Sequence, residues 1–198
     1  MDTPKLPTRP LHLGLAATAC LFLLGACGDD SLLTQPESVD VPPASAAAGP
    51  NVAASASGGA NWTLTVDFGG GPIDIDQVLA FNAQRSTDGD VHGRIVYHQT
   101  AFGETFSFQA DVSCIGVYDG NRGKFGGPVT KSNDATIPVG TYIWFHVIDG
   151  GQGAGASPDF SSGAGFGDET ANQEFCDSPA LPNPVFLAEV TSGNIEVR

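Results

Sequence analysis

The stretch Thr105-Phe106-Ser107-Phe108-Gln109-Ala110-Asp111-Val112-Ser113-Cys114 alternates between apolar and polar side chains along its whole length. A period of two is typical of a β-strand, because successive side chains of an extended chain point to opposite faces. The apolar series that starts at Phe106 predicts one buried face, and Cys114 stands at the end of that series. We therefore expect a strand over 105–114 that buries one side of a sheet.

Shorter stretches of the same kind lie on both sides of this strand, separated by clusters of Gly, Asp, Asn and Pro that are typical of turns. The expected strands are 61–68, 78–84, 90–99, 105–114, 114–119, 123–131, 141–148, 185–190 and 195–197. A candidate helix at 76–84 is too short and too poorly capped to be assigned. The chain is therefore predicted to be all-β, with a single antiparallel β-sandwich or barrel of about eight strands.

One long segment interrupts this rhythm of strands. Residues 149–184 are rich in glycine in their first half, and Cys176 and three prolines follow. A loop of this length in a compact domain is usually functional or disordered. We expect a single β domain over 61–198 that carries this glycine-rich loop at 149–184.

The N-terminal residues have the pattern of an export signal. Lys5 and Arg9 precede an apolar run at 11–24 that is too short to cross a bilayer as a helix. The run ends in Leu24-Gly25-Ala26-Cys27, which resembles the lipobox of bacterial lipoproteins. The resemblance implies cleavage after Ala26 by signal peptidase II and acylation of Cys27, for example with palmitate. The alternatives are an ordinary signal peptide with an unmodified Cys27, or a short membrane anchor.

Lipidation implies an extracytoplasmic protein that is held at a membrane by its acyl chains. The aspartate that retains some lipoproteins in the inner membrane falls at Asp29 instead of directly after Cys27, so the resemblance favours the outer membrane. Residues 1–26 are thus expected to be a lipoprotein signal peptide. Residues 27–60 contain few large apolar side chains and are predicted to be a flexible, disordered tether.

The charge of the chain limits its partners. The sequence holds 8 Lys and Arg against 22 Asp and Glu, a net charge of −14, and removal of residues 1–26 makes the net charge −15. This excess excludes nucleic acid as a partner, because phosphate neutralisation by Lys and Arg supplies much of that affinity. Acidic loop residues are candidate Ca²⁺ ligands, although acidic residues in turns are the commoner explanation. The candidates are Asp149, Asp159, Asp168 and Glu169.

Two cysteines remain for the domain if Cys20 leaves with the signal peptide and Cys27 is lipidated. In an oxidising compartment, Cys114 and Cys176 are expected to form a disulfide bond. Two free thiols, or a metal pair completed by histidine, are the alternatives.

A second resemblance extends over most of residues 77–198. It is carried by 112–117, Gly120-Asn121, 147–153, the late cysteine and the Gly193-Asn194-Ile195 turn. These segments are similar to a group of uncharacterised secreted bacterial β-rich proteins. The resemblance implies the β fold and the paired cysteines, and it implies no activity.

No sequence pattern assigns a catalytic residue. A Gly-x-Ser-x-Gly elbow and a phosphate-binding glycine loop are absent from the sequence, and His92 and His98 would lie about 20 Å apart on one strand. We expect a lipid-anchored cell-envelope protein without a cofactor that acts as a non-enzymatic binding or structural module with an unknown partner. One alternative is a small-molecule or glycan-binding domain, Ca²⁺-dependent or not, lined by Phe160, Phe166 and Phe175. The other is a hydrolase whose site the sequence does not reveal.

Overall fold

The computed structural model describes residues 51–67, 69–181 and 187–198, which form two layers of antiparallel strands and one helix. Sheet A contains β1 (Val52–Asp67), β2 (Pro72–Ser86), β3 (Val91–Ala101), β4 (Glu104–Asp111) and β11 (Ser192–Val197). Sheet B contains β5 (Cys114–Tyr118), β6 (Arg122–Ser132), β7 (Tyr142–Ile148), β8 (Phe160–Ser162), β9 (Gly165–Gly167) and β10 (Leu187–Glu189). The helix is α1 (Glu169–Asp177). The all-β prediction is confirmed.

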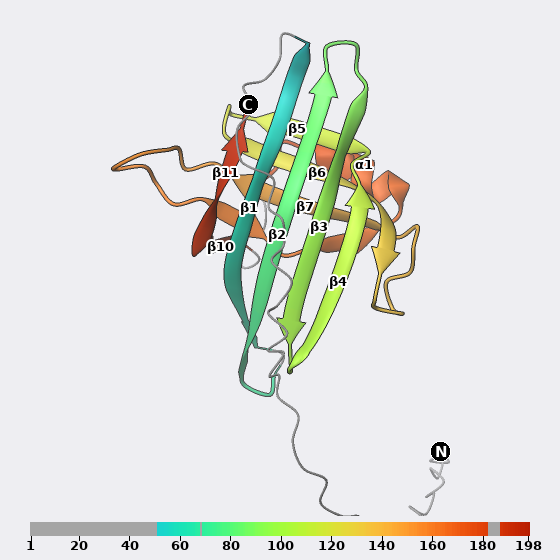
Figure 1. Cartoon of the computed structure of the whole chain (residues 1–198), viewed down its shortest axis with the longest axis vertical. Helices are drawn as coiled ribbons and strands as arrows, with labels where there is room; N and C mark the ends of the chain where they lie inside the picture. The colour runs from blue at the N-terminus through green and yellow to red at the C-terminus, as the bar shows by residue number, and fades with distance from the viewer. Residues whose placement is uncertain (1–50, 68, 182–186) are drawn as a thin grey trace, which may run out of the picture. The chain divides into compact units, whose positions relative to one another are not determined.

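The two layers are parts of one sheet that folds over itself. In Figure 1 the long strands β1 to β4 stand in front, and the strands of sheet B run across them behind. Strand β6 joins the layers: its first part pairs with β5 and β7, and its end pairs with β4. The strand order runs from β10 to β11 without closing, so the domain is a sandwich and not a barrel.

The core between the layers is built from apolar side chains that alternate along the strands. Phe81 of β2 stacks on Phe125 of β6 with ring centroids 4.4 Å apart, and Tyr97 of β3 lies 5.1 Å from Phe145 of β7. These four rings are almost completely buried. Because each contact joins a strand of sheet A to a strand of sheet B, they hold the two layers together.

The alternating stretch 105–114 proves to belong to both layers. Strand β4 ends at Asp111. The Val112 N–H then donates to Gly93 O of β3, whereas the Ser113 N–H donates to Gly126 O of β6. The chain therefore crosses from sheet A to sheet B here, and the predicted single strand is corrected to two. Cys114 is buried as expected, but α1 covers it and it does not contribute to the core between the sheets.

The domain also begins earlier than the sequence predicted. Strand β1 starts at Val52, so residues 52–60, expected to be tether, are part of the sheet; residues 27–50 lie outside the described residues. This part of β1 looks like a linker because its residues are small. They are small because β11 passes close by: a Cβ on Gly58 would lie 2.2 Å from Asn194 O. Close packing, and not disorder, explains this composition.

The predicted loop 149–184 contains three short elements, β8, β9 and α1. Sequence patterns missed α1 because this helix buries only Asn172 and Cys176 and so lacks an apolar stripe. Its signal is the N-cap, where the Asp168 carboxylate accepts the Ala171 N–H at 2.9 Å. The candidate helix at 76–84 lies within strand β2. Among the described residues, α1 is too short and polar to span a bilayer, and no other helix does so.

Candidate functional site

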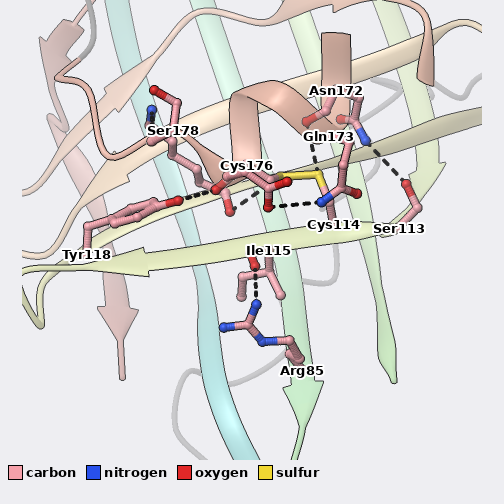
Figure 2. Close-up of a disulfide and its surroundings, with 11 residues drawn as sticks. Arg85, Ser113, Cys114, Ile115, Tyr118, Asn172, Gln173, Cys176 and Ser178 are labelled. Carbon is pink, nitrogen blue, oxygen red and sulfur yellow. Dashed lines mark hydrogen bonds between the residues drawn. A yellow bond between two sulfur atoms is a disulfide. The ribbon is translucent and has the colours of Figure 1, made fainter. Parts of the chain in front are cut away.

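The predicted disulfide is present and fixes α1 against sheet B. Cys114 at the start of β5 is bonded to Cys176 near the end of α1, with the two Cα atoms 6.0 Å apart (Figure 2). Two glycines let the helix approach the sheet. A Cβ on Gly126 would lie 2.1 Å from Asn172 Oδ1, and a Cβ on Gly116 would lie 2.2 Å from Cys176 O. The end of α1 therefore lies directly on the backbone of β5 and β6.

Three side chains from sheet B bind the carbonyl groups at the end of this helix. The Tyr118 hydroxyl donates to Cys176 O, as Figure 2 shows. The Lys124 ammonium donates to Ser178 O at 2.6 Å, and both terminal nitrogens of Arg122 donate to Pro179 O at 3.2 Å. The last carbonyls of a helix lack partners within the helix, and cations there also match its dipole. These donors thus cap the C-terminus of α1.

The capping cations are buried and lie close together. Lys124 is 3% exposed and Arg122 is 8% exposed. The Lys124 ammonium and the Arg122 guanidinium each lie 5.8 Å from the centre of the Tyr118 ring, and the ammonium lies 4.9 Å from that of Phe175. Burial, followed by the nearby Arg122 charge, lowers the pKa of Lys124.

Their charges are only partly balanced. Arg122 forms an ion pair with Asp119 at 2.6 Å, but the carboxylate side chain of Asp119 is 72% exposed. Within the part of the chain that the structure describes, Lys124 forms no ion pair with a carboxylate. A buried ammonium without a counter-ion lowers stability unless hydrogen bonds or ring contacts compensate for its desolvation.

A third basic group lies beside this pair. His146 of β7 is the cross-strand neighbour of Lys124 and is 1% exposed. Neither ring nitrogen of His146 has a hydrogen-bond partner. Burial, followed by the charges of Lys124 and Arg122, lowers the pKa of His146 to about 4. We call Arg122, Lys124 and His146 the basic cluster.

The basic cluster predicts an acid-sensitive fold. The unfolded imidazole titrates near pH 6.5 and the folded one near pH 4, so the unfolded chain binds more protons between these values. The contribution of neutral His146 to the free energy of unfolding is therefore fully present above pH 6.5, and it is lost as the pH decreases toward 4. The free energy of unfolding of the wild type should therefore decrease between pH 7 and pH 4. We expect this decrease to be about 2 to 3 kcal/mol smaller in His146→Phe, measured by urea unfolding at pH 7, 5.5 and 4.

The control for this prediction is His92→Phe, which removes an exposed imidazole on the outer face of sheet A and leaves His146 in place. This variant should keep the wild-type slope. An equal loss of stability with falling pH in wild type and His146→Phe would contradict the assignment.

Three of the four acidic residues predicted as Ca²⁺ ligands bind backbone amides. The two oxygens of Asp159 accept the N–H groups of Gly150 and Ile195 at 2.8 and 2.7 Å, and those of Asp149 accept from Gly151 and Val197. Asp168 caps α1, and exposed Glu169 occupies the first turn of that helix. Among the described residues, no three His, Cys, Asp or Glu side chains converge as a metal site would require. Asp149 and Asp159 therefore protect the edge strand β11, because the N–H groups of Ile195 and Val197 would otherwise lack partners.

This role of Asp159 is testable by an amide substitution. We expect Asp159→Asn to lower the free energy of unfolding by about 1.5 kcal/mol or more, because an amide accepts one N–H and turns its own NH₂ toward the other. Asp168→Asn is the matched control, since asparagine caps a helix as well as aspartate does. Equal stability of the two variants in urea unfolding would contradict the role of Asp159.

The structure does not bring the predicted aromatic residues together. Phe160 of β8 pairs with Ile148 of β7, whereas Phe166 of β9 pairs with Ile143. Five residues of strand separate these positions, which corresponds to about 17 Å. Phe175 is on α1 and stacks on Trp144 at 5.7 Å. The three rings therefore do not line a common binding site.

An open pocket of about 410 Å³ lies beside the glycine-rich segment 151–159. Small and polar residues line most of it, and both carboxylate oxygens of Asp159 in its wall already bind backbone amides. None of the predicted aromatic residues lines it. Ser157 is among the residues that line this pocket. Ser162 does not line it; the Ser162 hydroxyl oxygen accepts the backbone N–H of His146 at 2.9 Å.

The residues that sequence reasoning missed are Tyr118, Arg122 and Lys124. Arg122 directly precedes the strand expected at 123–131, and Lys124 lies within it. A charged residue that alternates with apolar ones predicts a face exposed to solvent, so the local pattern gave no signal that these side chains are buried. No family model, no curated protein and no solved structure matches this chain.

Proposed function

We propose that this protein is a lipid-anchored protein of the bacterial cell envelope whose β-sandwich acts as a non-enzymatic binding or structural module. The observation that carries the proposal is Leu24-Gly25-Ala26-Cys27 at the end of a short apolar run. Cys27 lies outside the described residues, so the proposal on lipidation depends on the sequence alone. Outer-membrane attachment remains the favoured form of this proposal.

One feature of the domain supports an extracytoplasmic location, and a second suits a lipid anchor. The Cys114–Cys176 disulfide suits an oxidising compartment, because such bonds are rare in reducing cytosol. The strand β1 starts 25 residues after Cys27, a length of chain that reaches at most about 85 Å. An anchored Cys27 would thus leave the sandwich room to stand clear of the membrane surface.

The proposal predicts that acylation depends on one thiol. Cells that produce the wild-type protein or Cys27→Ser are grown with radiolabelled palmitate, and the protein is then isolated. We expect label in the wild type and complete loss of label in Cys27→Ser, which should also keep its leader, because signal peptidase II cuts only after the cysteine is modified.

Cys20→Ser is the matched control, since it removes a cysteine seven residues before Cys27, within the expected leader. It should be labelled like the wild type. Equal labelling of Cys27→Ser and wild type, or mass spectrometry that finds an unmodified residue 27 in the wild type, would contradict lipid anchoring.

A further inference from the structure

The segment Ser178–Leu181, which we call the strap, binds Arg122 and Lys124 of the basic cluster. Ser178 and Pro179 of the strap offer their carbonyl oxygens to Lys124 and Arg122, the Ala180 N–H donates to Ser178 Oγ at 3.3 Å, and the Ser178 N–H donates to Glu174 O of α1 at 3.1 Å. Pro179, Ala180 and Leu181 are exposed, and Leu181 is 71% exposed. The strap therefore contributes little apolar packing of its own.

The disulfide does not restrain the strap directly. Cys176 precedes it in the chain, so α1 stays bonded to β5 whether the strap is on the cluster or away from it. The Ser178 N–H is bound within the helix to Glu174 O, so a hinge would lie after this residue. Residues 179–181 can thus move without unfolding α1.

The donors beneath the strap are those that recognise phosphate. The two Arg122 nitrogens converge on one oxygen, and the Lys124 ammonium with its three donors binds the next carbonyl. A forked guanidinium beside an ammonium suits a tetrahedral oxyanion. The adjacent His146 adds two buried ring nitrogens without partners. Neutral carbonyl oxygens satisfy these donors in part; the exposed Asp119 balances Arg122, whereas Lys124 forms no ion pair among the described residues.

We propose that Arg122 and Lys124, with His146 beside them, form a binding site for a soluble phosphate group, and that the strap occupies this site as an internal ligand which phosphate displaces. The proposal extends the binding role suggested above and does not depend on the lipid anchor. The cluster is buried under the strap, so a small soluble phosphate reaches it more easily than a flat bilayer does. A phosphate dianion would provide the negative charge that these cations lack.

The test uses the full-length protein in detergent and titrates it with inorganic phosphate at constant ionic strength, with chloride as the reference salt. We expect saturable binding by calorimetry. Amide hydrogen exchange at Ala180, whose N–H donates to Ser178 Oγ, should become faster with phosphate and not with chloride, because the ligand favours the displaced strap. Exchange in α1 ahead of Cys176 should not change.

Two lysine variants of β6 distinguish specific phosphate binding at this site from nonspecific attraction of anions to the protein. Lys124→Met should weaken phosphate binding at least about tenfold, since it removes a charge-assisted hydrogen bond. Lys131→Met removes an exposed lysine of β6 and should bind like the wild type. Near-UV circular dichroism checks that both variants are folded. If Lys124→Met does not fold, the comparison of phosphate with chloride in wild-type exchange decides the matter.

Three results would overturn the proposal. Absence of saturable binding would mean that the donors only cap α1. Binding that survives Lys124→Met, or that Lys131→Met weakens equally, would mean an adventitious ion only. Binding without faster exchange at the strap would place phosphate elsewhere. Palmitate labelling of Cys27 is independent of all three, so failure here would leave the proposal of a lipid-anchored protein untouched.

Discussion

Removal of the disulfide is expected to lower the free energy of unfolding by about 4 kcal/mol. The bond closes a loop of 62 residues between Cys114 and Cys176, and this loop gains its freedom in the unfolded chain when the bond is absent. We therefore expect Cys114→Ala/Cys176→Ala to unfold at a much lower urea concentration than the oxidised wild type. The change should be seen by far-UV circular dichroism, with a melting temperature lower by roughly 10 °C.

Reduced wild type supplies the control for this prediction. Treated with a thiol reductant under denaturing and refolding conditions, it should match the double variant in stability, because both lack the same bond. The reductant should leave the double variant unchanged. Equal stability of oxidised and reduced wild type would show that the bond contributes nothing to the fold.

Replacement of Phe125 by alanine is expected to cost about 4 kcal/mol. The ring of Phe125 is fully buried, stacks on Phe81 of the opposite sheet at 4.4 Å, and lies 6.0 Å from Phe145. Truncation leaves a cavity where the two layers meet, because β6 cannot shift far enough to close it. Urea unfolding should show a lower midpoint with an unchanged slope.

The matched control is Phe102→Ala in the β3–β4 turn, where the ring is 77% exposed. It should change stability by less than about 0.5 kcal/mol. A similar loss in both variants would mean that the two layers are not joined through Phe125 in solution.

The two proposals concern different parts of the chain and fail independently. Lipid anchoring depends on Cys27 and predicts acylation, whereas phosphate binding depends on Arg122 and Lys124 within the described sandwich. The acid sensitivity expected from His146 connects stability to the same cluster. A buried cation without a counter-ion, such as Lys124, lowers stability, and functional sites commonly show such a loss.

Part of this architecture could be predicted from local patterns. The period of two in 105–114 predicts extended chain, and turn residues between short apolar runs predict antiparallel pairing. These features depend on neighbours along the chain, so the sequence shows them directly. From the same kind of pattern, the small residues of 52–60 were expected to form a tether. They belong to β1 instead, and they are small because β11 lies close to them.

The candidate site could not be predicted in this way. Lys124 and His146 are 22 positions apart and become neighbours through the β6–β7 register, and the strap that covers them comes from beyond α1.

Local patterns along the chain are enough to predict the all-β class, the strong negative charge and a cysteine pair within the β domain. The positions of Cys114 against α1 and of β6 in both layers, and the burial of Arg122 and Lys124, follow from long-range contacts. Alternation specifies which residues share a face of a strand. What covers that face depends on where the chain crosses between layers, and hence on contacts between residues far apart in the sequence.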